Sequence, residues 1–350
     1  MDTYVEVRKK IRSLPLLLLL LVAACSRPPS VALEEVDTFG PNPGDLRMLV
    51  YVPSSLGPGV RRPGNGDTSG QEAGRGVKNV SSPAVPLVVA LHGCTQDAQE
   101  YAENSGWASL ADRWDFLLLL PEQRRSNNWT RCFNWYSPED SRRDSGEALS
   151  IRQMIARMQR DYAVDPQRIY VTGISAGAAM TMNLAADYPD VFAGAAPVAG
   201  IPFGCADGFL SALGCMWDPP DKDAVEWGAE VRSATDHYQG PWPRISVWQG
   251  GADSAVDPAN AEAIVSQWTN VHGIGSTPED AHDLKGHVHS LYRDSSGRVL
   301  VESYRINGMG HGVPVDPGPG RNQCGKAARF FPDVDICSSL RIAELWGLDR

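Results

Sequence analysis

Residues 168–186 have the sequence RIYVTGISAGAAMTMNLAA, and this stretch decides the fold. Its first part, RIYVT, is an apolar run typical of a buried strand, and its last part, AGAAMTMNLAA, favours a helix of small residues. Between them lies GISAG (residues 173–177), a GxSxG motif on a strand-to-helix turn. Such a turn needs small neighbours because chain segments approach closely, and it exposes the serine hydroxyl at a helix N-terminus. We therefore predict that Ser175 is a nucleophile.

Further apolar runs and helix-spaced patterns lie on both sides of this motif. Strands are predicted at 46–52, 87–91, 116–120, 192–198, 245–248 and 299–306, and helices at 148–162, 257–271 and 338–348. Most of the strand runs are continuously apolar, which is typical of strands buried on both faces. Strands that alternate with helices favour a mostly parallel sheet with helices on both faces. The sequence therefore predicts an α/β fold.

A nucleophilic serine needs a base, and the base needs a carboxylate that orients it. The run ISVWQGGADSAV places Asp253 in a glycine-rich turn directly after an apolar strand. The run YRINGMGHGVPV places His311 after the next strand, again among glycines. A serine, an acid and a histidine in this order, each after a later strand, form the triad of one large group of α/β enzymes. We predict a catalytic triad of Ser175, Asp253 and His311.

Other residues compete for the roles of acid and base. Asp257 lies close to Asp253, but its position before Pro258 is more typical of a helix cap. His92 precedes a glycine beside the predicted oxyanion loop, so we expect it to shape that loop and not to act as the base. The remaining candidates lie in polar or helical settings and are expected to be solvated: His237, His272 and His282.

The tetrahedral oxygen of an acyl-transfer reaction needs backbone N–H donors. One donor is predicted at Ala176, directly after the nucleophile, and the other at Cys94, in the turn that follows the strand LVVAL. Trp135 and Tyr136 are candidates for an apolar wall that contacts the acyl chain, and packing in the core is an equally good interpretation of both.

The N-terminus has the pattern of an export signal. Four basic residues at positions 8–12 precede an apolar stretch at 14–24, which is shorter than the roughly 20 residues that a spanning helix needs. The stretch ends in small residues before Cys25 and resembles a bacterial lipobox. This resemblance implies cleavage before Cys25 and acylation of that residue. The localisation expected is extracytoplasmic, lipid-anchored to a bacterial membrane (the outer membrane in a Gram-negative source) or secreted.

The chain has seven cysteines, so six remain if Cys25 carries lipid. Six thiols in an oxidising compartment allow 15 disulfide connectivities. Close spacing favours Cys205 with Cys215 and Cys324 with Cys337, which leaves Cys94 with Cys132. The cysteine spacing suggests no metal site. His287 and His289 are two residues apart and could share one face of a strand, and two exposed strand histidines are favoured over a metal site.

Composition limits the class of protein and its partners. The 350 residues are 42% hydrophobic and 21% charged, and 42 acidic against 32 basic residues give a net charge of −10. This balance argues against nucleic-acid binding, which favours clustered Lys and Arg. We expect a signal peptide at 1–24, a tether at 25–45 and one catalytic domain at 46–350. A flexible excursion rich in Gly and Pro is expected at 56–84 within that domain.

Six strings together resemble the poly(3-hydroxybutyrate) depolymerase family of esterases. They are LHGCTQ (91–96), CFNWY (132–136), GISAGAAM (173–180), GGADSAV (250–256), GMGHGVPV (308–315) and CSSLRIAELWGL (337–348). The resemblance runs from about residue 46 to 348 and implies an α/β-hydrolase fold and ester hydrolysis without a metal or organic cofactor. Gln249 is a departure, because many relatives place a histidine there, and the excursion at 56–84 is another.

The resulting hypothesis is a serine esterase that hydrolyses poly(3-hydroxybutyrate)-type polyester or its oligomers. Its partners are then the ester substrate and, through Cys25 alone, a membrane. Hydrolysis of feruloyl or acetyl xylan esters is the alternative within the same enzyme class. A non-catalytic surface binding protein on a hydrolase scaffold is the alternative from another class, and the complete predicted triad argues against it.

Overall fold

The computed structural model describes residues 31–62, 83–235 and 238–350. Cys25, the predicted signal peptide, most of the predicted excursion and His237 lie outside these residues. The described strands are β1 (Glu34–Glu35), β2 (Arg47–Tyr51), β3 (Val85–Leu91), β4 (Leu117–Glu122), β5 (Val164–Ile174), β6 (Gly194–Val198), β7 (Arg244–Gly250), β8 (Asp280–Leu284), β9 (His287–Arg293) and β10 (Val299–Ile306).

The helices follow the strands along the chain. The α-helices are α1 (Ala98–Asn104), α2 (Trp107–Trp114), α3 (Pro138–Ser141), α4 (Gly146–Asp161), α5 (Ala176–Asp187), α6 (Phe209–Trp217), α7 (Ala224–Ala234), α8 (Ala259–His272) and α9 (Ser338–Trp346). Two short 3-10 helices lie at Ser54–Leu56 and Pro58–Val60. Among the described residues, no helix combines the length and apolar character needed to cross a lipid bilayer.

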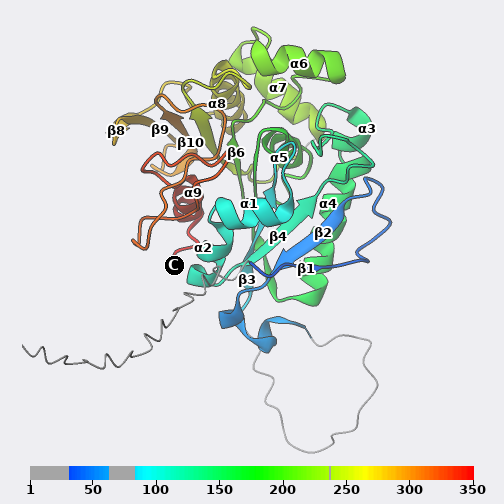
Figure 1. Ribbon diagram of the computed structural model, residues 1–350. Coiled ribbons are helices and arrows are strands. Elements are labelled where there is room, and N and C mark those ends of the chain that lie inside the picture. The colour runs from blue at the N-terminus through cyan, green and yellow to red at the C-terminus, as the bar shows by residue number, and fades with distance from the viewer. Residues whose placement is uncertain (1–30, 63–82, 236–237) are drawn as a thin grey trace, which may run out of the picture. The chain divides into compact units, whose positions relative to one another are not determined.

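The strands form one sheet in the order β1-β2-β4-β3-β5-β6-β7-β10-β9-β8 (Figure 1). The six strands from β4 to β10 in this order pair in parallel, and both edges of the sheet are antiparallel. Because parallel strands share a direction, the loops after β3, β5, β7 and β10 leave the sheet at the same edge. These are the loops that carry the predicted site residues.

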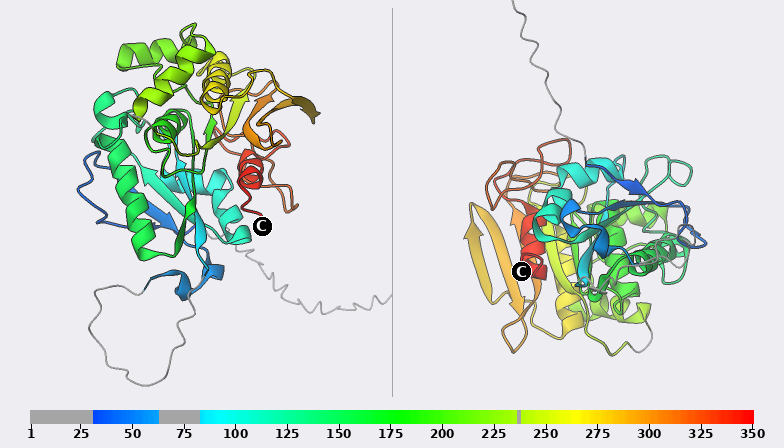
Figure 2. Two further views of the ribbon diagram at one scale, coloured as in Figure 1. Left: turned by 180° about the vertical axis from the view of Figure 1, so that it is seen from behind. Right: turned by 90° about the horizontal axis from the view of Figure 1, so that it is seen from below.

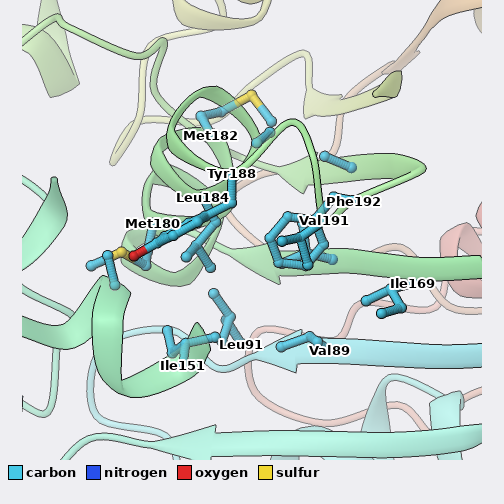
Figure 3. Packing of buried hydrophobic residues seen from close by; sticks show 14 of the residues in the cluster. Val89, Leu91, Ile151, Ile169, Met180, Met182, Leu184, Tyr188, Val191 and Phe192 are labelled. Carbon is cyan, nitrogen blue, oxygen red and sulfur yellow. The ribbon is translucent and has the colours of Figure 1, made fainter. Parts of the chain in front are cut away.

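Helices cover both faces of the sheet, as the continuously apolar strands predict (Figure 2). On β3, Leu87, Val89 and Leu91 belong to one buried cluster together with residues of α4, α5 and α8. Val88 and Ala90 belong to a second cluster with α1, α2 and α9. Figure 3 shows the first cluster, in which β3 side chains pack beneath α5. The predicted α/β architecture, a mostly parallel sheet between helices, is confirmed.

Helix α5 is buried along its whole length, and its small side chains make this possible. All 12 residues from Ala176 to Asp187 are buried, so the helix has no polar face toward solvent. A helix of this kind depends on tertiary packing because its sequence has no amphipathic pattern. Its N-terminus is therefore held firmly at the edge of the sheet where β5 ends.

Part of the predicted tether packs against the domain. Glu34 and Glu35 form β1 and pair with β2, and Phe39 is buried in the first cluster. Val31 and Leu33 pack against the second cluster. The prediction of a tether relied on the proline and polar content of this segment, and the apolar side chains between those residues anchor it to the core.

The start of the predicted excursion is also attached to the domain. Val60 is 1% exposed, and its carbonyl accepts a hydrogen bond from the N–H of Ala163 at 2.9 Å. Arg61 forms a β-bridge with Tyr162 in the connection between α4 and β5. Residues 56–62 therefore belong to the folded domain, while 63–82 lie outside the described residues.

Two expectations about histidines are corrected. His289 on β9 is not simply exposed: its ring stacks on Tyr304 with centroids 3.9 Å apart, and its Nε2 lies 3.0 Å from Glu302 Oε2. His272 is not solvated, because its Nε2 lies 3.0 Å from the Pro243 carbonyl and burial lowers its pKa to about 4. His282 is exposed, as expected.

Candidate active site

Ser175 occupies a strained turn between β5 and α5. Its backbone angles, φ 56° and ψ −121°, lie in a region that side chains other than glycine rarely adopt. The N–H of Ser175 donates to the Val198 carbonyl at 3.0 Å and fixes the turn to β6. A Cβ on Gly177 would lie 2.4 Å from the carbonyl oxygen of His92, so only glycine fits there. The motif brings the serine turn directly against the loop that follows β3.

The loop after β3 is held by several interactions around Cys94. The N–H of Gly93 donates to Gln96 Oε1 at 2.8 Å, and the N–H of Thr95 donates to the Thr130 carbonyl at 2.6 Å. A disulfide joins Cys94 to Cys132. Cys94 therefore has a fixed backbone position on the loop that contacts the serine turn.

Ala176 and Cys94 line the same cavity as Ser175. Within the described part of the chain, the backbone N–H of neither Ala176 nor Cys94 donates a hydrogen bond. Backbone N–H groups of this kind, on the cavity that contains the serine, are the donors that an oxyanion hole requires.

His92 is fully buried and bonded on both ring nitrogens. Nδ1 lies 2.7 Å from the Gly93 carbonyl, and Nε2 accepts from the N–H of Gln123 at 3.1 Å. This pair of partners fits a neutral ring, and burial lowers the pKa of His92. Both nitrogens are thus engaged by the backbone, which fits the expected role in shaping the loop.

Asp253 and His311 form a hydrogen-bonded pair. Asp253 follows β7 and His311 follows β10, and His311 Nδ1 lies 2.8 Å from Asp253 Oδ2. The Asp253 side chain is fully buried, whereas 16% of the His311 side chain is exposed. The N–H groups of Ala255 and Val256 donate to Asp253 Oδ1 at 2.8 and 3.0 Å.

The pKa of Asp253 reflects these contacts. Burial raises it, but the hydrogen bond and charge of His311, together with the two backbone amides, outweigh burial and hold the pKa below its usual value. The carboxylate is therefore ionised and oriented toward His311 Nδ1. A histidine held in this way by a carboxylate can accept a proton on its other nitrogen.

Backbone packing joins this pair to the serine cavity. A Cβ on Gly250 would lie 2.4 Å from the Gly310 carbonyl, so the loops after β7 and β10 are in direct contact. Val256, whose N–H binds Asp253, also lines the cavity that contains Ser175. The structure thus brings the predicted acid and base together, and it places them at the sheet edge where the serine turn lies.

Asp257 makes a different contact from Asp253. Its Oδ1 accepts from the N–H of Ala259 at 2.9 Å, at the first residue of α8. The contact lies at the start of the helix, where the sequence predicts Asp257, although Asp257 itself is one residue before the cap position. Helix α8 begins at Ala259, two residues later than predicted, because Pro258 occupies the cap position.

Gln249 is an additional partner of Asp253 that the sequence reveals only as a departure from the family. Its Nε2 donates to Asp253 Oδ2 at 3.1 Å and to the Val256 carbonyl at 3.2 Å. Its Oε1 is buried without a hydrogen-bond partner among the described residues. The amide therefore binds the same carboxylate oxygen as His311.

The cavity beside Ser175 has a volume of about 500 Å³ and an uncharged lining. The residues that line it are Cys94, Asn127, Asn128, Trp129, Thr130, Cys132, Asn134, Trp135, Tyr136, Ser175, Ala176, Ile201, Phe209, Ala212, Leu213, Met216 and Val256. The absence of charge is informative, because 21% of the whole chain is charged. The cavity therefore favours a neutral, largely apolar ligand.

Trp135 and Tyr136 both contribute to this lining. Their ring centroids are 5.6 Å apart, and Tyr136 contacts Phe209 of α6 at 6.0 Å. Trp135 is only 8% exposed and also belongs to the buried core. The two interpretations from the sequence, core packing and a cavity wall, therefore both describe Trp135.

Glu147 of α4 holds the loop that carries these aromatic residues. Its carboxylate accepts from the N–H and the Nδ2 of Asn134 at 2.9 Å each, and from Gln123 Nε2 at 2.5 Å. Burial raises the pKa of Glu147 to about 8, against the effect of these hydrogen bonds. Glu147 thus connects Asn134, in the cavity lining, to Gln123, the residue after β4 whose N–H binds His92.

Helix α6 supplies the part of the cavity that the sequence did not indicate. Phe209, Ala212, Leu213 and Met216 line the cavity from one face of this helix. The run FLSALGCMW was an available signal, but a mostly apolar run of this length does not by itself distinguish a helix from a strand. The other lining residues for which the sequence predicted no role are Asn127, Asn128, Trp129, Thr130, Asn134, Ile201 and Val256.

The structure joins the cysteines in the pairs that spacing favoured, Cys94–Cys132, Cys205–Cys215 and Cys324–Cys337. A group of three carboxylates, Asp316, Asp333 and Asp335, has oxygens within 4.8 Å of one another. Lys285 Nζ lies 3.7 Å from Asp316 Oδ2, and Gln323 Nε2 donates to Asp316 Oδ1. The Asp316 carboxylate therefore already has positive and hydrogen-bonding partners.

Comparisons with known proteins show which family this chain resembles. A family described as esterase PHB depolymerase matches residues 79–282. A poly(3-hydroxyalkanoate) depolymerase C of Paucimonas lemoignei is 45% identical over 94% of this chain and 73% of its own length. A feruloyl esterase B of Talaromyces funiculosus is 32% identical over 85% of this chain and 78% of its own length.

Among solved structures, an acetyl xylan esterase of Aspergillus awamori matches with a TM-score of 0.70 and 22% identity. It covers 91% of this chain and 99% of its own. This likeness supports the fold, and the sequence matches identify the family. The chain is a carboxylic ester hydrolase with an α/β-hydrolase fold, and it belongs to the esterase PHB depolymerase family.

Proposed function

We propose that this protein hydrolyses poly(3-hydroxybutyrate)-type polyester or its oligomers with Ser175, His311 and Asp253 as catalytic triad. The observation that carries the proposal is the pairing of Asp253 with His311 beside an uncharged cavity that contains Ser175. The 45% identity to a poly(3-hydroxyalkanoate) depolymerase supports the choice of substrate.

In the proposed mechanism, His311 removes the proton of Ser175 as its hydroxyl attacks the ester carbonyl. Asp253 holds His311 through Nδ1 and stabilises the positive charge that forms on the ring. The N–H groups of Cys94 and Ala176 bind the oxygen of the tetrahedral intermediate. The alcohol leaves with a proton from His311, and a water activated by His311 then hydrolyses the acyl-serine.

The cavity lining supports a neutral acyl group as ligand. A 3-hydroxyacyl unit carries no charge within a polymer, so it loses little hydration in a cavity without charged side chains. Trp135 and Tyr136 are proposed to contact the acyl chain, since both rings line the cavity near Ser175. A feruloyl or acetyl xylan ester is the alternative substrate, supported by the more distant relatives.

A substrate series tests the proposal. The purified protein and Ser175→Ala are assayed on p-nitrophenyl esters, hydroxybutyrate oligomers and methyl ferulate. We expect turnover of the oligomers by the wild-type protein and a loss of at least about 10³-fold in Ser175→Ala. Preference for methyl ferulate would assign the protein to the plant-polysaccharide esterases. Turnover that does not depend on Ser175, without labelling by a phosphonate probe, would refute the triad.

We further propose that Cys25 is acylated and that the esterase is displayed outside the cytoplasm. The small residues before Cys25 and the apolar stretch at 14–24 support this proposal. Residues 1–24 are then the signal peptide. Metabolic labelling with a fatty acid tests it: the label is expected on the wild-type protein and absent from Cys25→Ser. Equal labelling of both proteins would contradict the assignment.

A further inference from the structure

Gln249, the amide partner of Asp253, lines a second cavity with a volume of about 300 Å³. This cavity lies between α8 and the face of the sheet formed by β7, β10 and β9, and Figure 1 shows α8 next to β9 and β10. It shares no described lining residue with the Ser175 cavity. Small-molecule sites in proteins have volumes of about 300–1,000 Å³, so the space suits one small ligand.

The face of the sheet beneath α8 changes from apolar to polar toward this cavity. Val301 of β10 pairs with Tyr292 of β9, and both belong to the first buried cluster. Two residues further along β10, Ser303 pairs with Ser290. Residues two apart on a strand point to the same face, and both serines line the cavity. Two small hydroxyl side chains thus lie where larger apolar side chains would fill the space.

The buried end of the cavity carries a hydrogen-bond acceptor without a partner. Gln249 is 2% exposed, and its Nε2 donates to Asp253 and to the Val256 carbonyl. These two acceptors fix the orientation of the amide, so Oε1 faces away from them and has no hydrogen-bond partner among the described residues. A buried amide oxygen in this state requires a donor, and a ligand in the adjoining cavity can supply one.

Hydroxyl groups line the rest of the polar surface. Those of Ser303 and Tyr292 lie within hydrogen-bonding reach of each other, and Ser290 lies beside Ser303. Each hydroxyl can both donate and accept, and it rotates to suit its partner. The lining therefore matches a ligand whose own groups are hydroxyls.

The charges at the cavity favour a neutral ligand. Arg305 Nη1 lies 3.9 Å from Glu262 Oε1, and both side chains are more than half exposed. These two lining residues carry opposite charges, so the lining has no net charge. An anion would be repelled by Glu262 and by the ionised Asp253 behind Gln249, and a cation would be repelled by Arg305.

We propose that this cavity binds a small neutral polyhydroxylated molecule, a monosaccharide or polyol, with one ligand hydroxyl donating to Gln249 Oε1. The other hydroxyls of the ligand bind Ser290 and Ser303. Its C–H groups contact the ring of Tyr292 and the side chain of Val265, which also line the cavity. The site lies outside the Ser175 cavity, and the binding does not depend on the proposed function.

A ligand in this cavity is connected to the Asp253–His311 pair through a single amide. When Gln249 Oε1 accepts a hydrogen bond, the amide is polarised, and Nε2 donates more strongly to Asp253 Oδ2. His311 binds the same oxygen, so it is held less strongly. Gln249 is in this sense a positioning residue, and the ligand is expected to lower kcat about two- to fivefold. This effect, unlike the binding, rests on the proposed triad.

Binding is measured first, without reference to turnover. Xylose, glucose and erythritol are titrated into the full-length protein and followed by calorimetry and ligand-detected NMR. We expect saturable binding of at least one of them to the wild-type protein. The affinity is expected to be about tenfold lower in Ser290→Ala/Ser303→Ala and in Gln249→Leu, because each loses hydrogen bonds to the ligand. Ser109→Ala, on α2 outside the cavity, is the control and is expected to bind as wild type does.

Three results would overturn the binding proposal. The first is the absence of saturable binding of all three probes. The second is equal affinity in wild type and in both cavity variants, which would place the ligand elsewhere. The third is tighter binding of 3-hydroxybutyrate, a hydroxyl-bearing anion, at this cavity than of any neutral probe. Unfolding midpoints of the variants show whether a loss of affinity reflects a loss of folded protein. Ala261→Leu, which fills the cavity from α8 and removes no polar group, is a further test and is expected to abolish binding.

The connection to Asp253 is tested by kinetics on p-nitrophenyl butyrate. With the site saturated, kcat of the wild-type protein is expected to fall about two- to fivefold. The same ligand concentration is expected to leave the kcat of Ala261→Leu at its value without ligand. An unchanged kcat in the wild-type protein at saturation would overturn the connection through Gln249. Absence of Ser175-dependent turnover in every protein would instead count against the proposed function and leave the binding result standing.

Discussion

At the scale of single residues, the Asp253 carboxylate accepts hydrogen bonds from four N–H groups. His311 and Gln249 bind Oδ2, and the amides of Ala255 and Val256 bind Oδ1. Every donor favours the ionised form, which the orientation of His311 requires. Gln249 is neutral at any pH, so its contribution does not vary with protonation.

We predict that Gln249→Glu lowers kcat about 100-fold at pH 8. The new carboxyl replaces a donor 3.1 Å from Asp253 Oδ2, and two buried like charges at this distance repel each other. At pH 5.5 the buried carboxyl retains its proton, so the loss relative to wild type is expected to shrink. The measurement is kcat and KM for p-nitrophenyl butyrate between pH 5 and 9.

A matched control separates this effect from simple destabilisation. Gln267 is equally buried, and its amide binds the Phe203 and Trp227 carbonyls away from Asp253. Gln267→Glu is expected to lower stability without a pH-dependent loss of kcat. Equal pH profiles for the two variants would show that Gln249 does not act through Asp253.

The Ser175 turn and the contact of Asp253 with His311 could be anticipated from the sequence because each residue follows an apolar strand in a glycine-rich turn. Parallel strands direct such turns to one edge of the sheet, so the order of the strands and turns along the chain predicts which residues lie close together. Gln249 could not be assigned in this way. Its contact with Asp253 depends on how the strand end and the following turn are placed in space, and no local pattern reports that.

At the scale of elements, the parallel strands were predictable and α6 was not. Strands such as β3 and β4 are apolar on both faces, a signal that is independent of the rest of the fold. Helix α6 and the β8–β9 hairpin lie outside the parallel core, and their sequences match no strict period. Their conformation is set by contacts with other parts of the chain, among them the Cys205–Cys215 bridge.

We predict that Cys205→Ser/Cys215→Ser raises KM for p-nitrophenyl hexanoate three- to tenfold while kcat stays within twofold. Loss of the bridge loosens α6, whose inner face lines the cavity, but does not touch Asp253 or His311. Loss of a bridge that closes a short loop is also expected to lower the unfolding free energy by about 3 kcal/mol. Steady-state kinetics and denaturant unfolding measure the two effects.

Cys324→Ser/Cys337→Ser is the control for this prediction. This bridge spans 13 residues against 10 for Cys205–Cys215, so the expected loss of stability is similar, and neither cysteine lines the cavity. KM is expected to remain at the wild-type value. An equal rise of KM in both variants would mean that α6 has no specific part in substrate binding.

At the scale of the whole molecule, the apolar cores on the two faces of the sheet leave few buried charges, and Asp187 is one of them. It is 2% exposed at the end of α5, and its Oδ2 has no hydrogen-bond partner among the described residues. Burial raises its pKa from 3.8 to about 7, although Arg143 opposes the shift. The overall net charge does not reveal such a site, because it depends on where one carboxylate lies in the fold.

This shift makes global stability depend on pH in a defined direction. Below pH 3.8 the carboxyl is protonated in both the folded and the unfolded chain, and the contribution of Asp187 to stability is complete. Between pH 3.8 and about 7 the unfolded chain releases the proton while the folded protein retains it, so stability falls as pH rises. Above about pH 7 the carboxyl is ionised in both states, and the whole stabilising contribution of Asp187 has been lost.

We predict that Asp187→Asn stabilises the protein at pH 8 by about 1–3 kcal/mol and has little effect at pH 4, because asparagine keeps the neutral form at every pH. Denaturant unfolding at several pH values measures the difference. Asp190→Asn is the control with the opposite sign: Arg143 lies 2.7 Å from Asp190 and holds its pKa below the usual value. Stability from that pair exists above the unfolded pKa, so its removal is expected to destabilise the protein at pH 8. Lower stability of Asp187→Asn at pH 8 would show instead that an ionised Asp187 is paired in the folded state.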